Sequence, residues 1–450
     1  MSKRAFSATP VKTAGMPPGI PFIIGNEAAE RFTYYGLRGI LVVFMTKYLF
    51  TRTGQPDFMS EENAKVAYHN FVSAVYFFPL LGGLLADSLL GKYRTIIWLS
   101  IVYCFGALAL FGDSTRSGLF LGLTLIAVGS GGIKPCVSAH VGDQFGSANQ
   151  HLLPRIFSWF YFSVNFGSTF SMMLIPWLLA NYGARTAFAL PFILMVLATW
   201  IFWLGRYRFA HIPPGGKAFV RETFSRDGLR SIGQLLIIYA FVAVFWSLWE
   251  QTASAWVLQA GHMNLRAFGR EWLPAQVQTL NPIFTLTFIP LFSYVIYPMI
   301  DKVFPLTPLR RISIGLFVTA MPFLIAAWVE TQIKIGLHPH VAWQALGHAL
   351  MTAAEILVSI TCLEFSYTQA PRKMKSVIMG IYYLSISLGN QFTALVNRFI
   401  QNPDGTNKLP GASYYMFFAV LMFVTAIVFI FVARRYKERI YIQEEVLQTA

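Results

Sequence analysis

The sequence carries little charge for its length. Only 12% of its 450 residues are Asp, Glu, Lys or Arg, whereas 55% are hydrophobic. The charged share is about half of that in soluble globular proteins. One water-solvated core cannot bury this much apolar surface, so the composition excludes an ordinary soluble enzyme, a disordered protein and a nucleic-acid binder. A polytopic α-helical membrane protein remains, with the lipid bilayer as its surroundings.

Cysteine and catalytic motifs are also scarce. The three cysteines, Cys104, Cys136 and Cys362, lie inside apolar runs without metal-ligand spacing. We therefore expect buried thiols and no disulfide framework. The chain contains no HExxH, no GxSxG and no His/Cys ligand cluster. The sequence thus predicts no enzyme, no metal site and no cofactor.

Long apolar runs, by contrast, are abundant. A spanning helix needs about 20 apolar residues, whereas strands of a membrane barrel would be half as long and alternating. The first 20 residues are basic, rich in Pro and Gly, and lack the apolar centre of a signal peptide. The sequence predicts twelve membrane-spanning helices, at 22–49, 67–90, 95–112, 117–139, 155–181, 186–204, 232–260, 277–300, 312–332, 341–368, 375–400 and 412–433.

The basic residues in the connections predict the orientation. If the N-terminus is cytoplasmic, most of the 35 Lys and Arg residues fall in cytoplasmic segments, so both termini are expected inside. The most polar connection divides the helices six and six. This is the pattern of the major facilitator superfamily, in which the substrate site lies near the midplane, although other twelve-span folds share the count. The predicted parts are a tail (1–20), a six-helix bundle (21–204), a linker (205–231), a second six-helix bundle (232–433) and a tail (434–450).

A few charged residues lie within the predicted spans. Each would cost about 2.5–3.5 kcal/mol if it faced lipid near the bilayer centre. They must therefore pair with one another or line a wet cavity. These residues are Glu27, Glu30, Arg31, Arg38, Lys134, Glu250 and Glu355.

The first span has the densest set of charges. At 100° per residue, Glu27, Arg31, Tyr34 and Arg38 form one stripe directed into the bundle, with Glu30 on its flank. The stripe is either a structural ladder of ion pairs or a ligand site with spare cationic capacity.

Two further residues of the first half titrate or carry charge. Lys134, in the glycine-rich segment GSGGIKP, requires a carboxylate partner, for which we expect Glu27 or Glu30. That pair is either permanent or a proton-coupled switch. His69 near the start of the second span is either an interfacial histidine or a proton carrier.

The second half offers acids without nearby bases. The segment FWSLWEQTASAW places Trp246, Glu250 and Ser254 on one helical face, and Asn281 directly precedes a proline. Glu355 has no Lys or Arg in its own span. It is expected to meet a cation from elsewhere, such as a substrate amine, or to be a protonated carboxyl bonded to neighbouring helices.

The two halves together suggest a zwitterionic ligand such as a short peptide. Its carboxylate would lie on Arg31, Arg38 or Lys134, and its ammonium would lie near Glu355.

Several motifs resemble the proton-coupled oligopeptide transporter family of the major facilitator superfamily. Glu27, Glu30 and Arg31 match the ExxER motif of that family, and FYFSVNFGS around Asn165 matches its FYxxxNxG block. The blocks GGLLADSLLGKYRT, GSGGIKP, FWSLWEQ and LNP are also similar. The blocks LEFSYTQAP and YHNFV look closest to the animal di- and tripeptide transporters.

The resemblance implies a role for each matching residue. The proton-linked network would comprise Glu27, Glu30, Arg31 and Lys134, with His69 matching the span-two histidine of animal members. The carboxylate side of the peptide pocket would comprise Arg31, Tyr34, Tyr35, Arg38 and Lys134. Tyr161 and Asn165 would bind the peptide backbone. The amino-terminal side would comprise Trp246, Glu250, Asn281, Glu355 and Ser359.

The resemblance thus predicts a proton-driven importer of di- and tripeptides in a plasma or bacterial inner membrane, functional as a monomer. Only about ten residues separate spans nine and ten, where animal members carry a large extracellular domain. Tyr382 and Tyr383 stand where the family commonly has Trp, which bears on side-chain preference. Two alternatives remain open: the same fold carrying an amino acid, nitrate or a peptide-like drug, and a peptide sensor without transport.

Overall fold

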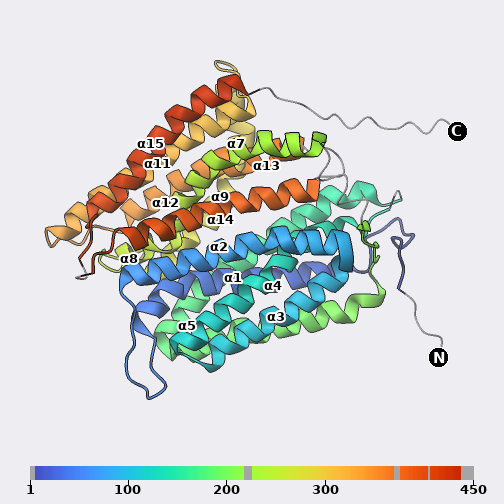
Figure 1. Cartoon of the computed structure of the whole chain (residues 1–450), viewed down its shortest axis with the longest axis horizontal. Coiled ribbons are helices and arrows are strands. Elements are labelled where there is room, and N and C mark those ends of the chain that lie inside the picture. The colour runs from blue at the N-terminus through green and yellow to red at the C-terminus, as the bar shows by residue number, and fades with distance from the viewer. Residues whose placement is uncertain (1–5, 147, 217–225, 369–374, 404–405, 437–450) are drawn as a thin grey trace.

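The structure is a computed structural model that describes residues 6–146, 148–216, 226–368, 375–403 and 406–436. The first part of the chain forms the lower helices of Figure 1. Its elements are α1 (Ile20–Lys47), α2 (Glu61–Leu85), the π-helix η1 (Ala86–Leu90), α3 (Lys92–Gly112), α4 (Arg116–Gly142), η2 (Gln150–Leu152), α5 (Leu153–Leu204) and η3 (Gly205–Tyr207).

The second part forms the upper helices of Figure 1, with one small hairpin. Its helices are α7 (Arg226–Trp249), η4 (Glu250–Ala253), α8 (Ala255–Ala260), η5 (Pro274–Thr279), α9 (Leu280–Leu291), the π-helix η6 (Phe292–Ile296), α10 (Tyr297–Asp301), α11 (Pro308–Lys334), α12 (Ala342–Glu355), the π-helix η7 (Ile356–Ile360), α13 (Thr361–Thr368), α14 (Lys375–Phe399) and α15 (Ala412–Arg435). Strands β1 (Arg266–Ala267) and β2 (Arg270–Glu271) pair antiparallel, with Arg266 opposite Glu271.

All twelve predicted spans coincide with helical segments. Two of them lie in α5, which is interrupted at Gly183, where φ is 80° and only glycine fits without strain. In the described part of the chain, nine helices are long and apolar enough to cross a membrane, and residues 162–207 count as one of these. α1 falls outside the nine because it carries Glu27, Glu30, Arg31 and Arg38. The number twelve therefore stays a prediction.

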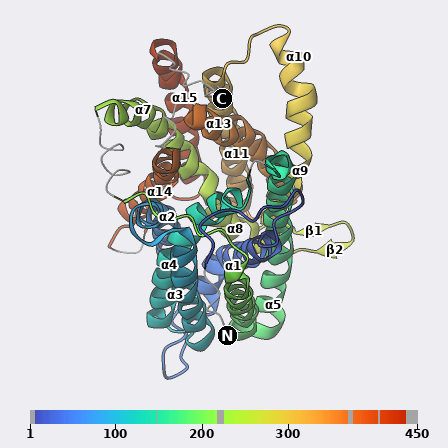
Figure 2. The same ribbon diagram turned by 90° about the vertical axis from the view of Figure 1, so that its right-hand side faces the viewer.

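The hydrophobic side chains form two large cores, one within each bundle, and a small cluster of Phe292, Ile356 and Leu357 in the second bundle. Residues of α1 to α5 dominate the first core, and residues of α7 to α15 dominate the second. Viewed from one end, the first bundle lies below the second, with α2 and α14 adjacent at their junction (Figure 2). The predicted helical, two-bundle architecture is confirmed.

Glycines set the packing that positions Lys134. A Cβ on Gly82 of α2 would overlap the backbone of Gly131 on α4, and a Cβ on Gly131 would overlap Phe78. A Cβ on Gly132 would overlap the side chain of Leu99 on α3. The GSGG segment thus lets α2 and α3 contact the α4 backbone, which fixes where Lys134 enters the bundle.

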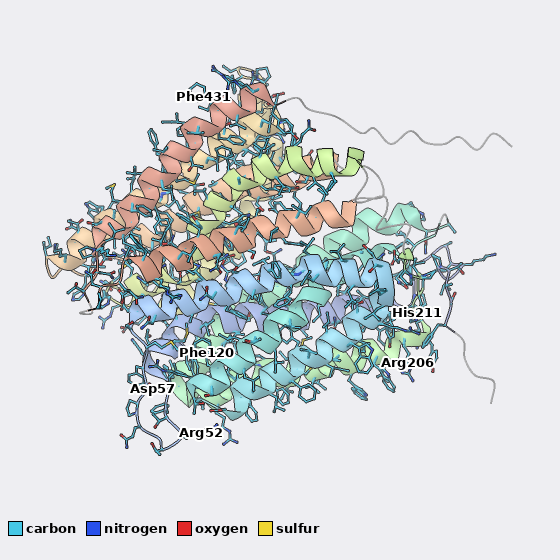
Figure 3. The ribbon with its side chains drawn as sticks, in the orientation of Figure 1. Arg52, Asp57, Phe120, Arg206, His211 and Phe431 are labelled. Carbon is cyan, nitrogen blue, oxygen red and sulfur yellow. The ribbon has the colours of Figure 1, made fainter. Side chains whose placement is uncertain are left out.

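The two ends of the molecule carry polar connections. Figure 3 shows Arg52 and Asp57 at one end, here called the Arg52 end, and Arg206 and His211 at the other, here called the linker end. At the linker end, the His211 amide donates to the Ser7 carbonyl (2.8 Å) and the Phe6 ring stacks on Tyr207 (5.4 Å between centroids).

The remaining parts of the predicted tails and linker, at residues 1–5, 217–225 and 437–450, lie outside the described residues. The cytoplasmic orientation of the termini stays a prediction.

Candidate functional site

The predicted charged residues converge between the two bundles. α1, α2 and α4 contribute from the first bundle, and η4, α9 and α12 contribute from the second. Glu27, Glu30, Arg38, Lys134 and Glu250 are all buried. This convergence of charge far from water suits a binding or coupling site better than an ordinary core.

On α1, one cation serves two carboxylates. Arg31 Nε lies 2.7 Å from Glu27 Oε1 and 3.1 Å from Glu30 Oε2. Glu27 Oε2 and Glu30 Oε1 are buried and have no hydrogen-bond partner in the described part of the chain. The Glu27–Glu30–Arg31 cluster therefore has one more acid than base, so a single proton would make it neutral.

Lys134 does not form the ion pair that the sequence predicts. Its Nζ lies 3.9 Å from the ring centroid of Tyr34 and 4.1 Å from that of Tyr76. Within the described ranges, it forms no ion pair and has no hydrogen-bond acceptor. The expected pairing with Glu27 or Glu30 is wrong in this conformation, in which both carboxylates pair with Arg31 through one oxygen each. Two aromatic faces hold the ammonium instead, through cation–π attraction.

Arg38 and Glu250 bind each other across the two bundles. Arg38 Nη2 lies 2.7 Å from Glu250 Oε2, and Arg38 Nε donates to the Tyr68 hydroxyl at 2.7 Å. The Tyr68 hydroxyl in turn donates to Glu250 Oε2 (3.3 Å), and the Arg38 guanidinium lies 4.9 Å from the Trp249 ring centroid. The sequence places Arg38 and Glu250 at opposite ends of a ligand. In this conformation each neutralises the other.

Glu355 is held by uncharged donors. Its Oε2 accepts from Trp249 Nε1 (3.0 Å) and Asn281 Nδ2 (2.9 Å), and Asn281 Nδ2 also contacts Thr352 Oγ1 (3.1 Å). No described Lys or Arg forms an ion pair with this carboxylate. Glu355 is the last residue of α12, and the π-helix η7 follows directly. Such π-turns often mark functional positions in helices.

Glu250 also lies at an irregularity of the helix. α7 ends at Trp249, the 3₁₀ turn η4 begins at Glu250, and Ser254 has non-helical backbone angles. The continuous face predicted through Trp246, Glu250 and Ser254 is therefore interrupted. Ser254 turns to the first bundle, where its hydroxyl contacts His69.

His69 lies at the junction of the bundles with both ring nitrogens bonded. Nδ1 lies 2.8 Å from Asn390 Oδ1, and Nε2 lies 2.9 Å from Ser254 Oγ. Both partners belong to the second bundle. Nearby, the Ser73 and Ser387 hydroxyls are 3.0 Å apart across the same junction. A role for His69 in proton coupling stays a prediction.

The remaining predicted residues surround this centre. Tyr34 packs edge-on against Tyr35 (5.3 Å), and Trp246 packs against Trp249 (5.3 Å). The Tyr34 hydroxyl and Trp246 Nε1 are buried and have no partner among the described residues. Asn165 on α5 is buried. The side chain of Tyr161 lies outside the described part of the structure.

The two tyrosines that stand where the family commonly has Trp border the same centre. The Tyr382 hydroxyl lies 2.9 Å from Ser359 Oγ, and the Tyr383 ring faces Tyr76 at 6.0 Å. Tyr382 thus ties α14 to the segment that follows Glu355.

Sequence reasoning missed several contact residues, among them Tyr68, Trp249 and Asn390. Tyr68 directly precedes His69, and Trp249 directly precedes Glu250. Asn390 is a buried amide inside the apolar run of α14. Its polarity at a buried helical position is the signal that could have found it.

Hydrogen bonds join the two bundles toward the Arg52 end. Asn407 Nδ2 donates to Glu62 Oε1 (2.7 Å), Gln276 Nε2 to the Met173 carbonyl (2.9 Å) and Gln278 Nε2 to the Gly39 carbonyl (3.2 Å). In Figure 1, α11 and α15 diverge from the first bundle toward the upper right. The site is therefore closed from the Arg52 end.

The described residues contain no group of three or more His, Cys, Asp or Glu side chains that could hold a metal ion. The buried charges of the site are side chains of the protein itself.

Known proteins resemble this chain in sequence. The sequence model of the POT family matches residues 93–226 and 220–416. Peptide transporter family 1 of Drosophila melanogaster is 36% identical over 365 residues, which cover 71% of this chain and 48% of the fly protein. Human solute carrier family 15 member 2 is 34% identical over 369 residues, which cover 71% of this chain and 49% of the human protein. The chain thus spans about half the length of these curated relatives.

Solved structures agree over nearly the whole chain. An auto-inhibited POT family peptide transporter superposes with a TM-score of 0.85 at 35% identity, covering 95% of this chain and 99% of the other. The POT family transporter PepTSo superposes with a TM-score of 0.86 at 36% identity, covering 94% and 99%. With its family match, its identities and its two-bundle fold, the chain belongs to the POT family.

Proposed function

We propose that this protein is a proton-coupled symporter that imports di- and tripeptides by alternating access. The observation that carries the proposal is the set of buried, oppositely charged groups between the bundles. Lys134 in the first bundle and Glu355 in the second are both without an ion pair in the described structure. Membership of the POT family supports the same function.

The ligand of this site would be a zwitterion. Its carboxylate would meet Arg31, Arg38 or Lys134, beside the rings of Tyr34 and Tyr35, and its ammonium would meet Glu355. Tyr161 and Asn165 would bind the peptide backbone. The amino-terminal side would further comprise Trp246, Glu250, Asn281 and Ser359. A charged ligand group leaves water at lower cost when a fixed countercharge awaits it.

Proton coupling would begin at the Glu27–Glu30–Arg31 cluster. A proton on Glu30 would remove one of the two carboxylates that hold Arg31 and leave the guanidinium and Lys134 a net attraction for the peptide carboxylate. His69 is the second candidate. If Nδ1 donates to Asn390, Nε2 accepts from Ser254, and a proton on Nε2 requires the Ser254 hydroxyl to turn.

Transport would follow from opening the closed end. Separation of the bundles there must break the Arg38–Glu250 pair and the contacts of His69 with Ser254 and Asn390. A proton that moves down a membrane potential of 100 mV supplies about 2.3 kcal/mol toward such rearrangements. Proton and peptide binding would shift the population between the two access states.

The proposal keeps the division of the chain that the sequence predicts. A tail (1–20), a bundle (21–204), a linker (205–231), a second bundle (232–433) and a tail (434–450) would form one functional monomer. Both termini would be cytoplasmic, and the membrane would be a plasma or bacterial inner membrane.

Uptake and current in proteoliposomes test the function. With an imposed inward proton gradient, a labelled dipeptide should accumulate above its outside concentration, and its addition should generate an inward current. A panel of di- and tripeptides should compete, whereas single amino acids and nitrate should not. Competition by nitrate or amino acids alone would point to another substrate. Binding without current or uptake would point to a sensor, and either result would refute the proposal.

A further inference from the structure

A groove lies on the outer side of the second bundle, between the beginning of α11 and the end of α15. It encloses about 740 Å³. Arg310 and Arg434 lie at the polar ends of the two helices, and Ile314, Phe317 and Ile430 line the groove further along them. The groove is separate from the charged site between the bundles.

Among the residues that the structure describes, the groove carries positive charge and no neutralising carboxylate. Arg310 and Arg434 are its two charged lining residues, and no Asp or Glu is among the described residues that line it. Neither arginine forms an ion pair with a carboxylate in the described ranges. Arg310 Nη1 donates to the Pro305 carbonyl (2.7 Å), and its guanidinium lies 4.4 Å from the Phe304 ring centroid. These contacts hold the Arg310 charge at the mouth of the groove.

The walls below the arginines suit a hydrocarbon chain. Seven residues separate Arg310 from Phe317, which corresponds to about 10 Å along the helix. The neighbouring face of α15 exposes large apolar side chains, among them Phe423, Val424 and Phe431. Figure 3 shows Phe431 on the outside of the molecule, near the end of α15. In a membrane, this face borders lipid.

We propose that the groove binds an anionic phospholipid. Its phosphate would lie between Arg310 and Arg434, and one acyl chain would run along Ile314, Phe317 and Ile430. Two cations at the end of adjacent spanning helices, above an apolar cleft, match an acidic headgroup followed by hydrocarbon. Basic pockets of this kind between helices bind acidic headgroups. A free phosphate would use the arginines alone and leave the apolar walls unfilled.

Native mass spectrometry of the delipidated full-length protein tests the proposal. Phosphatidylglycerol and phosphatidylcholine of identical acyl chains would be titrated against the wild type and Arg310→Gln/Arg434→Gln. The wild type should prefer phosphatidylglycerol, and the double variant should bind it about twenty-fivefold more weakly, since each arginine that faces the acidic headgroup contributes roughly fivefold. Equal affinity of the wild type for both lipids, or full retention by the double variant, would overturn the proposal.

Two further variants separate the groove from surface charge in general. Lys302→Gln/Arg435→Gln removes the same charge at the same end of the bundle but outside the groove lining, and should retain affinity within about twofold. Ala433→Trp fills the groove without a change of charge and should weaken binding as the arginine variant does. An equal loss of lipid affinity in the Lys302/Arg435 control, or full lipid affinity in Ala433→Trp, would contradict binding of the lipid in the groove. Displacement of the lipid by millimolar inorganic phosphate would assign the arginines to free phosphate instead.

Discussion

The two bundles stabilise their buried charges in different ways. In the first bundle, Glu27, Glu30 and Arg31 pair within a single helix. In the second bundle, Glu250 pairs with a cation from the opposite bundle, and Glu355 is held by uncharged donors. Charges paired within one helix stay together when the bundles move. The Arg38–Glu250 pair exists only while the bundles are in contact at this level.

This difference assigns separate tasks to the two regions under the proposed function. Protonation changes charge within the first bundle, and closure is stabilised by contacts between the bundles. Four substitutions test this division of tasks.

The largest effect is expected from Glu30→Gln, which mimics the protonated carboxyl permanently. Uptake against a gradient should fall by at least about a hundredfold because no proton is carried, whereas exchange of labelled for unlabelled peptide should continue. Proteoliposome uptake and counterflow measure the two activities. Glu61→Gln, an exposed carboxylate of the same bundle, is the matched control and should behave as wild type. Undiminished uphill uptake in Glu30→Gln would remove Glu30 from the coupling network.

Removal of Arg38 should destabilise the closed arrangement next most strongly. Arg38→Met leaves the buried Glu250 carboxylate without a cation, which typically costs about 3–5 kcal/mol. Thermal unfolding in detergent should show a clear drop in Tm. Arg38→Met/Glu250→Leu should recover much of it because no charge is left buried. If Glu250→Leu lowered the Tm by the same amount in Arg38→Met as in the wild type, the two residues would not be coupled.

Loss of the second-bundle acid should have an intermediate effect on ligand affinity. Glu355→Ala should weaken binding of peptides with a free amino terminus at least about tenfold, because a hydrogen bond to a charged group is lost. Peptides with a blocked amino terminus should bind nearly unchanged. Competition for labelled dipeptide gives both values, with Glu364→Gln on α13 as the control. Equal weakening for both peptide classes would refute the role of Glu355 as the amine partner.

The smallest effect concerns the chain start, which covers the linker end of the first bundle. Burial lowers the pKa of His211, against the opposing influence of its hydrogen bond to the Arg206 carbonyl, and Arg94 lowers the pKa further. The contact between the chain start around Ser7 and His211 therefore favours the neutral His211 ring. Docking should weaken as pH falls through the ordinary histidine range near 6.5, because the undocked form takes up the proton first.

Hydrogen exchange of the His211 amide measures this effect. After correction for intrinsic rates, exchange should be faster at pH 5.5 than at pH 7.5, and His211→Phe should abolish the difference. His262→Phe, at an exposed histidine outside this contact, should leave it intact. A pH dependence that persists in His211→Phe would assign the titration to another group.

The fold was predictable because its determinants are local. Apolar runs of spanning length fix the helices, and the polar stretch around Pro213 and Gly215 separates the bundles. The irregular turns were not predictable. The 3₁₀ turn at Glu250 and the π-helix after Glu355 depend on tertiary packing that hydrophobic periodicity does not encode.

The charged residues of the candidate site were predictable from the free-energy cost of placing a charge in lipid, but their partners were not. Charges in apolar helices must converge, which correctly gathered Glu27, Arg31, Arg38 and Glu250 between the bundles. Partner choice depends on distances of a few ångströms between helices that are remote in sequence. Arg31 pairs with the two carboxylates that were expected for Lys134, and Lys134 contacts two aromatic rings instead.

The glycine contacts of α4 have a consequence for timing. Gly82 and Gly131 bring the backbones of α2 and α4 into close contact, so the most rapid response of Lys134 to a change of charge is a rotation of its own side chain. Side chains reorient in picoseconds to nanoseconds when they have room, whereas domains move in microseconds to milliseconds. The ammonium can thus sample its partners many times before the bundles rock once. Under the proposed function, the slower motion of the bundles would set the pace of each cycle.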